Sequence, residues 1–335
     1  KKVYQGHEKS VDGVVSIADG KLLTYSGDQT LRVWSQETGE CLAEMEGHDK
    51  KIQGAMELQD GRVLSWSSDA KLKIWEVSDG SCAQVLEGHK KLIQGARELK
   101  DGRVVSWSSD ATIKVWDTST GDVVLDMTEH SKLIKGVRKY DDDTLISWSS
   151  DKTLKTWDLG SGDCKLTLEG HKGLVLDARK LSNDRVISIA KKDPMILWDM
   201  TTGTELMRFE TEEDADGATE MDDGALLAWF RKSDTFRKWD LGTGDLLLEA
   251  TYEEAMNQYP ELWRARQQAG RYETDRGPWR SHGLSGGAIL YFDSEDEAPR
   301  GVEWKETGSW NNMLLTEDGI ITVHAGQYFH PLHLF

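Results

Sequence analysis

A histidine, a serine, an aspartate and a tryptophan recur together in this sequence at fixed distances from one another. In one copy they are His48, Ser65, Asp69 and Trp75. Serine, histidine and aspartate are the side chains of a nucleophilic triad, in which the histidine takes the proton of the serine hydroxyl. Taken alone, this copy suggests a hydrolase.

The number of copies argues against catalysis. An enzyme needs one activated nucleophile in one pocket, whereas this set occurs in four copies in the same register, with a threonine in place of the serine in the first. We therefore predict a structural role, with no catalytic residue, no metal site and no cofactor. The four sets are His7, Thr24, Asp28 and Trp34; His48, Ser65, Asp69 and Trp75; His89, Ser106, Asp110 and Trp116; and His130, Ser147, Asp151 and Trp157.

The sets belong to an internal repeat that does not drift along most of the chain. A tryptophan returns every 41 residues at Trp34, Trp75, Trp116, Trp157, Trp198 and Trp239. Gly-His pairs keep the same step, for example at Gly47 and His48. A fixed period of this length predicts a repeat architecture in which each copy is one supersecondary unit.

Within one copy the pattern is that of four short strands. Residues 52–58 are largely apolar, and the turn residues Asp60 and Gly61 separate them from 63–66. A polar turn then leads to the alternating run 72–75, and another turn leads to 82–86. Short runs rich in apolar and β-branched residues, bounded by turn formers, read as strands. A four-stranded repeat of this length predicts a propeller blade.

The chain resembles the WD-repeat family. The resemblance rests on the Gly-His start of most copies and on the Trp-Asp end of four of them, as at Trp116-Asp117 and Trp157-Asp158, with the variants Trp34-Ser35 and Trp75-Glu76. It covers residues 1 to about 250 closely and the last 25 residues loosely. It implies an all-β propeller in which the four sets form buried hydrogen-bond networks, and in which the Gly-His loops line the narrow face around a central channel.

We expect the ring to be closed by the N-terminal strand. Strands are expected at 312–315, 320–323 and 332–335, and residues 2–4 would supply the fourth strand of this last blade. Pairing the two chain ends would remove open edges that invite aggregation. The six regular copies and this composite one predict seven blades.

Residues 251–309 interrupt the repeat. Residues 252–270 have a helical pattern, and Pro260 is placed as at a helix start. We interpret 251–309 as a partly helical insertion into a propeller formed by 1–250 and 310–335. The alternative is a degenerate extra blade, which would make eight.

The last two regular copies depart from the pattern. Lys192 stands where the fifth copy should have its aspartate, with Asp193 one residue late. In the sixth copy Glu212 replaces the histidine, and Trp229 falls in the position of the serine. Decayed networks and a side remodelled for a partner are both open at this point.

The charge of the chain limits its partners. The formal net charge is −18, from 59 acidic and 41 basic side chains, which disfavours nucleic acids and anionic membranes. The sequence has no run of 18 or more apolar residues, so it predicts no membrane-spanning helix. The three cysteines are too few and odd in number for a disulfide framework, which favours a reducing, cytoplasmic environment. They are Cys41, Cys82 and Cys164.

One group of lysines contrasts with this acidic background. Each lies in or beside a Gly-His loop, where the family resemblance places it around the channel. Solvated loop charges are the plain interpretation, and a basic collar for an acidic or phosphorylated protein partner is the sharper one. The lysines are Lys9, Lys50, Lys91, Lys132 and Lys172.

The favoured function is a non-enzymatic protein-interaction or recognition platform. Its partner would bind the narrow face and the 251–309 segment, where Trp263 and Trp279 offer aromatic anchors. The alternative is a small-ligand receptor or an enzyme with a site at the channel mouth. The sequence begins at Lys1 instead of Met, which leaves open that the chain is one domain of a larger protein.

Overall fold

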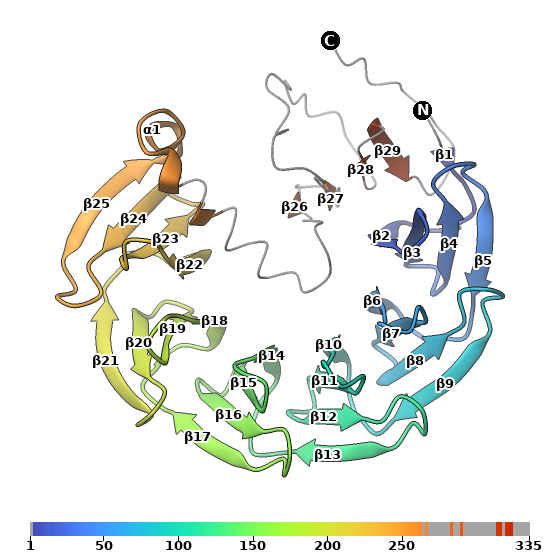
Figure 1. Cartoon of the computed structure of the whole chain (residues 1–335), viewed down its shortest axis with the longest axis horizontal. Coiled ribbons are helices and arrows are strands. Elements are labelled where there is room, and N and C mark those ends of the chain that lie inside the picture. The colour runs from blue at the N-terminus through green and yellow to red at the C-terminus, as the bar shows by residue number, and fades with distance from the viewer. Residues whose placement is uncertain are drawn as a thin grey trace. The chain divides into compact units, whose positions relative to one another are not determined.

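The computed structural model describes most of the chain up to residue 266 and short segments beyond it (Figure 1). Unit 1 and unit 2 are its two compact parts: unit 1 comprises 1–88, 118–121 and 274–335, and unit 2 comprises 89–117 and 122–273. No helix among the described residues is long and apolar enough to cross a membrane. The described residues are 3–262, 265–266, 282–283, 289–290, 313–316 and 319–323.

Unit 1 contains two four-stranded antiparallel sheets, each of which follows chain order. The first is formed by β2 (Val11–Ile17), β3 (Lys21–Ser26), β4 (Leu31–Ser35) and β5 (Cys41–Met45). The second is formed by β6 (Ile52–Glu57), β7 (Val63–Ser67), β8 (Lys71–Trp75) and β9 (Cys82–Glu87).

Unit 2 contains four more sheets of the same kind. The third is formed by β10 (Ile93–Glu98), β11 (Val104–Ser108), β12 (Ile113–Trp116) and β13 (Val123–Met127). The fourth is formed by β14 (Ile134–Lys139), β15 (Thr144–Ser149), β16 (Leu154–Asp158) and β17 (Cys164–Leu168). The fifth is formed by β18 (Val175–Lys180), β19 (Arg185–Ala190), β20 (Met195–Asp199) and β21 (Thr204–Phe209). The sixth is formed by β22 (Gly217–Glu220), β23 (Leu226–Phe230), β24 (Thr235–Trp239) and β25 (Leu246–Thr251).

The apolar core of each unit lies between successive sheets. In unit 1, Leu23 and Val33 of the first sheet pack with Ile52 and Val63 of the second. In unit 2, Trp107 of the third sheet belongs to one buried cluster with residues of the fourth. A sheet that is buried on both faces explains why the second strands, such as β7, are apolar at nearly every position.

The tryptophan in the second strand depends on a glycine opposite it in the first. Trp66 pairs with Gly54, and a Cβ atom on Gly54 would come within 2.3 Å of the Trp66 ring. Gly95 and Trp107 repeat the arrangement in the third sheet. Only glycine leaves room for an indole ring lying across the first strand, so the pair specifies the register of the first two strands.

The two chain ends pair with each other inside unit 1. β1 (Val3–Tyr4) runs parallel to β29 (Gly319–Val323), and β29 pairs with β28 (Met313–Thr316). β28 and β29 fall where the sequence predicts strands. β1 pairs with β29, whereas the segment 332–335, which the sequence predicts as the strand next to residues 2–4, lies outside the described residues. A closed ring of seven blades stays a prediction.

The other described elements lie within or after the interruption. α1 (Tyr252–Asn257) follows β25 at once, inside the stretch for which the sequence predicts a helix. Thr251 and Glu254 form a capping box at its start. Ala255 and Leu262 are buried against Trp229 and Phe236 of the sixth sheet. β26 (His282–Gly283) and β27 (Ile289–Leu290) form a two-stranded sheet.

Removal of residues 1–5 should destabilise unit 1. Tyr4 is buried against Trp34, with the ring centroids 5.7 Å apart, so the deletion removes both this contact and the backbone pairing with β29. We expect a melting temperature lower by several degrees, or aggregation through the exposed edge, in calorimetry and size-exclusion chromatography. A control lacking only Lys1 and Lys2 should match the full chain. An equally stable, monomeric deletion variant would show that β1 contributes nothing to the fold.

Candidate functional site

The predicted histidine, serine, aspartate and tryptophan sets form hydrogen-bond networks within single sheets. In the second sheet His48 precedes β6, Ser65 lies on β7, Asp69 lies in the turn after β7, and Trp75 ends β8. His48 Nδ1 lies 2.7 Å from Asp69 Oδ2, and His48 Nε2 lies 2.8 Å from Ser65 Oγ. Trp75 Nε1 donates to the same Ser65 oxygen at 2.8 Å. The network therefore joins a loop, two strands and a turn.

The first, third and fourth sheets repeat this arrangement with nearly the same distances. The histidine to aspartate distances lie between 2.7 and 3.0 Å. The histidine to hydroxyl distances are 2.7 or 2.8 Å, and each tryptophan donates to that hydroxyl at 2.8 Å. The residues are His7, Thr24, Asp28 and Trp34; His89, Ser106, Asp110 and Trp116; and His130, Ser147, Asp151 and Trp157.

Electrostatics favour an ionised aspartate beside a neutral histidine. Burial alone would raise the pKa of Asp69, but hydrogen bonds from His48 and from backbone N–H groups outweigh it and hold this pKa at about 2. Burial lowers the pKa of His7 below its usual value. A neutral imidazole can donate from Nδ1 to the carboxylate and accept at Nε2 from the hydroxyl. This tautomer satisfies the buried polar atoms.

The distances in these networks are those of a catalytic triad, but a substrate cannot reach the hydroxyl groups. The side chains of Ser65, Ser106 and Ser147 are fully buried, and Thr24 is 1% exposed. A lone pair of each hydroxyl oxygen is already taken by the tryptophan N–H. A substrate carbonyl cannot approach a nucleophile that is buried in this way, so these serines have a structural role.

The fifth sheet keeps its network despite the altered sequence. Asp193 Oδ2 lies 2.7 Å from His171 Nδ1, and His171 Nε2 lies 2.6 Å from Ser188 Oγ. Lys192 takes up the extra position with a φ of 53°, in the left-handed region. The turn therefore absorbs the one-residue shift, and the network has not decayed.

The sixth sheet has lost the network and replaced it with aromatic packing. The 41-residue count predicts Trp229 in the position of the serine, and this prediction is wrong. Trp229 pairs with Gly217, as Trp66 pairs with Gly54. One residue fewer before β23 moves Ala228 into the serine position. Trp239 instead packs against Phe209 at 5.7 Å and Phe230 at 6.5 Å.

The loop before β22 is acidic, and it has Glu212 where the other five regular copies have a histidine. It lines a depression of about 760 Å³ that includes Glu212, Asp214, Lys192 and Arg231. Asp214 accepts a hydrogen bond from the backbone N–H of Lys192 at 2.5 Å, and Asp216 accepts one from Arg231 at 2.6 Å. Carboxylates thus hold the loop in place of the missing histidine.

The predicted lysines lie in loops whose backbone is held by a second serine. Ser67 Oγ donates to the Lys50 carbonyl at 3.1 Å and accepts from the backbone N–H of Asp69. The sequence gives a signal for this serine, which returns every 41 residues, but our sequence reasoning did not single it out. The equivalent pairs are Ser26 with Lys9, Ser108 with Lys91, and Ser149 with Lys132.

The five lysine side chains are exposed, and none forms an ion pair with a described residue. Lys91, Lys132 and Lys172 precede β10, β14 and β18, which lie side by side in unit 2. Lys9 and Lys50 precede β2 and β6, which are neighbours in unit 1. We call the loops of Lys91, Lys132 and Lys172 the lysine edge.

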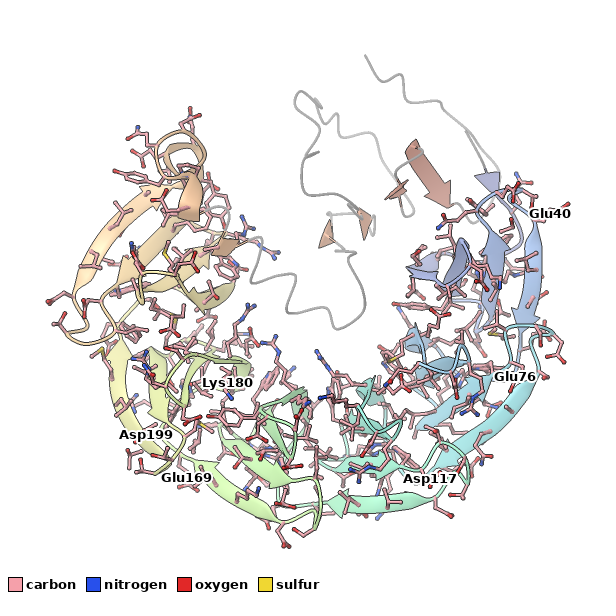
Figure 2. The ribbon with its side chains drawn as sticks, in the orientation of Figure 1. Glu40, Glu76, Asp117, Glu169, Lys180 and Asp199 are labelled. Atoms are coloured by element: carbon pink, nitrogen blue, oxygen red, sulfur yellow. The ribbon has the colours of Figure 1, made fainter. Side chains whose placement is uncertain are left out.

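Most other cations of unit 2 have acidic partners. Lys114 pairs with Asp126 at 2.7 Å, and Lys165 pairs with Asp158 at 2.7 Å. Lys180, labelled in Figure 2, donates to the Tyr140 carbonyl and lies 4.1 Å from the centre of its ring. The three ammonium groups of the lysine edge, in contrast, have no acidic partner among the described residues. The other predicted binding residues, Trp263 and Trp279, lie outside the described residues.

Comparisons with known proteins agree with this description. Residues 1–35 and 80–117 match the family model "WD domain, G-beta repeat". The chain contains WD repeats. Among solved structures, many match, including "Crystal structure of WD40 beta propeller domain of Doa1", with a TM-score of 0.52 and 23% identity over 74% of this chain and 84% of that chain. No curated protein matches the sequence.

The WD-repeat resemblance is therefore confirmed, and the structural match supports an all-β propeller fold with six four-stranded sheets. At this level of identity the match shows the fold alone. WD-repeat propellers generally act as protein-interaction scaffolds and are typically non-enzymatic, which makes a binding role the coarse expectation for this chain.

Loss of one network hydroxyl should destabilise its sheet measurably. Ser65→Ala leaves His48 and the Trp75 N–H without their buried partner, at a cost of about 1–3 kcal/mol in the free energy of unfolding. Trp75→Ala adds a cavity and should cost about 3–5 kcal/mol. Chemical denaturation measures both. The exposed Ser10 is the control, since Ser10→Ala should change the free energy by less than about 0.5 kcal/mol. Equal effects of Ser65→Ala and Ser10→Ala would contradict the network.

Acid should weaken the fold in two pH ranges. The neutral form of His7 and His171 is favoured in the folded state, so their contribution is present above about pH 6.5 and is lost as the pH falls below it. The pKa of Asp69 is depressed, so its contribution is present above about pH 4 and is lost towards pH 2.

Melting temperatures from pH 7 to pH 3 measure this dependence. Asp69→Asn should melt lower than the wild type at pH 7 and lose less stability between pH 5 and pH 3. Asp49→Asn, at the exposed position after His48 in the loop before β6, should keep the wild-type profile. An unchanged acid profile in Asp69→Asn would assign the acid sensitivity to other groups.

Proposed function

We propose that this chain is a non-enzymatic protein-interaction platform whose lysine edge binds an acidic or phosphorylated segment of a protein partner. The observation that carries the proposal is the set of Lys91, Lys132 and Lys172. These lysines are exposed, form no ion pair with a described residue, and lie in the loops before three neighbouring strands. On a chain with a formal net charge of −18, these lysines provide a local positive field of the opposite sign.

The construction of the loops supports recognition. The backbone of Lys91 and Lys132 is held by Ser108 and Ser149, and the hydrogen-bond networks hold the rest of each loop. Binding to a preformed loop costs little conformational entropy beyond that of the lysine side chains. Like charges on neighbouring loops raise one another's electrostatic cost, and an anionic partner relieves that cost. Lys9 and Lys50 of unit 1 have the same local construction and extend the proposal to that unit.

The triple change Lys91→Glu, Lys132→Glu and Lys172→Glu should weaken partner binding. The partner is first identified by affinity purification with the wild-type chain, and association rates are then measured at low and physiological salt. We expect a fall of about tenfold or more in the association rate at low salt, because charges at an interface steer encounter. The wild-type interaction should also fade as salt increases.

The control carries the same change of charge elsewhere on unit 2, at Lys100, Lys139 and Lys165. It should bind as the wild type does, and circular dichroism should show that both variants fold. If the lysine-edge variant binds like the wild type at both salt concentrations, the lysines are only solvated surface. The segment 251–309, with Trp263 and Trp279, would then be the next candidate.

A further inference from the structure

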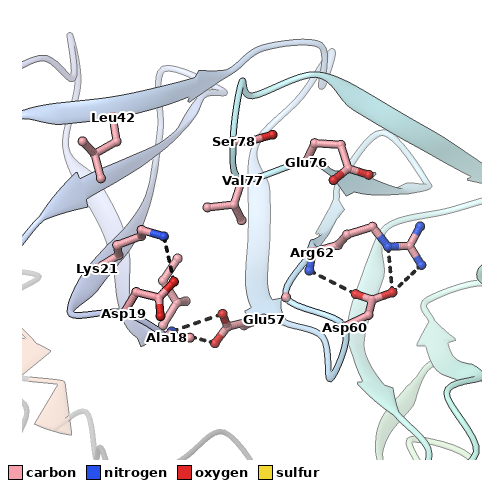
Figure 3. A pocket seen from close by; sticks show the side chains of 12 residues that line it. Ala18, Asp19, Lys21, Leu42, Glu57, Asp60, Arg62, Glu76, Val77 and Ser78 are labelled. Carbon is pink, nitrogen blue, oxygen red and sulfur yellow. Dashed lines mark hydrogen bonds and ion pairs between the residues drawn. The ribbon is translucent and has the colours of Figure 1, made fainter.

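Unit 1 has a pocket at the strand ends opposite its Gly-His loops. The pocket lies between the first and second sheets, has a volume of about 530 Å³, and is open to solvent (Figure 3). This volume falls in the range of small-ligand and side-chain pockets. Its lining comes from the turn after β2, the turn after β6, the start of β5 and the turn after β8.

Part of the lining is apolar. Ile17 is buried, Val77 is half-buried, and Leu42 is 46% exposed although it is a large hydrophobic side chain. Ile17 and Val77 also belong to the apolar core between the two sheets, which holds this side of the pocket in place. An aliphatic group that covered Leu42 and Val77 would remove apolar surface from water, at about 25 cal/mol per Å².

The charged lining is acidic in balance. Lys21 pairs with Asp19 at 3.1 Å, and Arg62 pairs with Asp60 at 2.7 Å, so both cations are already neutralised. Two further carboxylates remain. Glu57 accepts only the backbone N–H of Ala18, at 3.0 and 3.1 Å, and Glu76 forms no ion pair or side-chain hydrogen bond with the residues that the structure describes.

The side chain of Glu76 does not cap a turn, although the residue at the same position caps one in other sheets. The residue after the repeated tryptophan caps the next turn in other sheets. Asp158 accepts the backbone N–H groups of Gly160 and Ser161, and Asp240, two copies later, accepts those of Gly242 and Thr243. In the second sheet the turn is capped by Asp79, which accepts from Ser81. The carboxylate of Glu76, also labelled in Figure 2, is therefore available to the pocket.

We propose that this pocket binds an arginine side chain of a basic protein segment, with the guanidinium group on Glu76 and aliphatic carbons on Leu42 and Val77. Charge complementarity selects a cation, because the pocket has two carboxylates that no cation neutralises. The apolar lining selects arginine over a small ion, because its stem packs on hydrocarbon while its weakly hydrated, planar head binds carboxylates. This site takes the opposite charge from the lysine edge and lies in the other unit, so it is independent of the proposed function.

Binding of the dipeptide amide Ac-Leu-Arg-NH2 to the full chain tests the site. Methyl signals of Leu42 and Val77 are followed by NMR during titration, beside those of the exposed Leu206 and Leu247 of unit 2 as references. We expect saturable shifts at Leu42 and Val77 only. Ac-Leu-citrulline-NH2, which has the same shape without the charge, should bind about tenfold more weakly, as expected for loss of a charged hydrogen bond.

Two variants separate the charge from the apolar surface. Glu76→Gln keeps the size of the side chain and should weaken the arginine peptide about tenfold while leaving the citrulline peptide unchanged. Leu42→Ala should weaken both peptides. Glu37→Gln makes the same charge change in the corresponding turn of the first sheet, outside the pocket, and should bind as the wild type does.

Three results would overturn the proposal. They are equal binding of the two peptides, equal binding by Glu76→Gln and the wild type, and shifts that spread to the reference methyls without saturation. None of these results depends on the lysine edge, because a chain with Lys91, Lys132 and Lys172 changed to Glu should bind the arginine peptide as well as the wild type does.

Discussion

The buried hydroxyl that a histidine and a tryptophan share is the interaction on which each regular sheet depends. Ser65 Oγ lies on the second strand, and it receives the Trp75 N–H from the third strand and contacts His48 from the loop before the first. None of these groups can reach water, because the serine is fully buried. A shift of one residue in any of the strands would leave several buried polar atoms without hydrogen-bond partners, so the network enforces one register.

The fifth and sixth sheets show two responses to loss of this pattern. In the fifth, the turn takes a left-handed residue at Lys192 and returns Asp193 to His171, so the carboxylate still meets the imidazole. In the sixth, Ala228 cannot accept a hydrogen bond, and the space is filled by Trp239 with Phe209 and Phe230. A satisfied polar network and an aromatic cluster both fix a sheet, whereas a partly satisfied network would not.

The two ends of the strands have different electrostatic character because different residues remain after the structural needs are met. At the Gly-His end, the aspartates bind the network histidines, and Lys91 and Lys132, two residues after those histidines, are exposed without an ion-pair partner among the described residues. At the other end, the turns are capped by carboxylates such as Asp158, and a single replacement at Glu76 leaves a charge that no turn uses. The candidate binding surfaces thus consist of charged side chains that have no structural role in the repeat.

Much of the architecture could be predicted from the sequence, because the copies of a 41-residue repeat can be aligned with one another position by position. The spacing of Trp75 and Trp116, the Gly-His pairs and the turn residues determined four-stranded sheets, the members of each network and the exposed position of the lysines. These are local properties, since each network closes within one sheet.

Tertiary structure alone decided the rest. Counting by 41 misplaced Trp229, since only the pairing with Gly217 shows that β23 begins one residue early. Three features depend on which segments meet in space: the pairing of β1 with β29, the contact of Asp193 with His171 in the fifth network, and the place of Glu76 in the same pocket as Leu42. Sequence spacing does not encode those contacts, because they join residues of different sheets or turns whose lengths vary by a single residue.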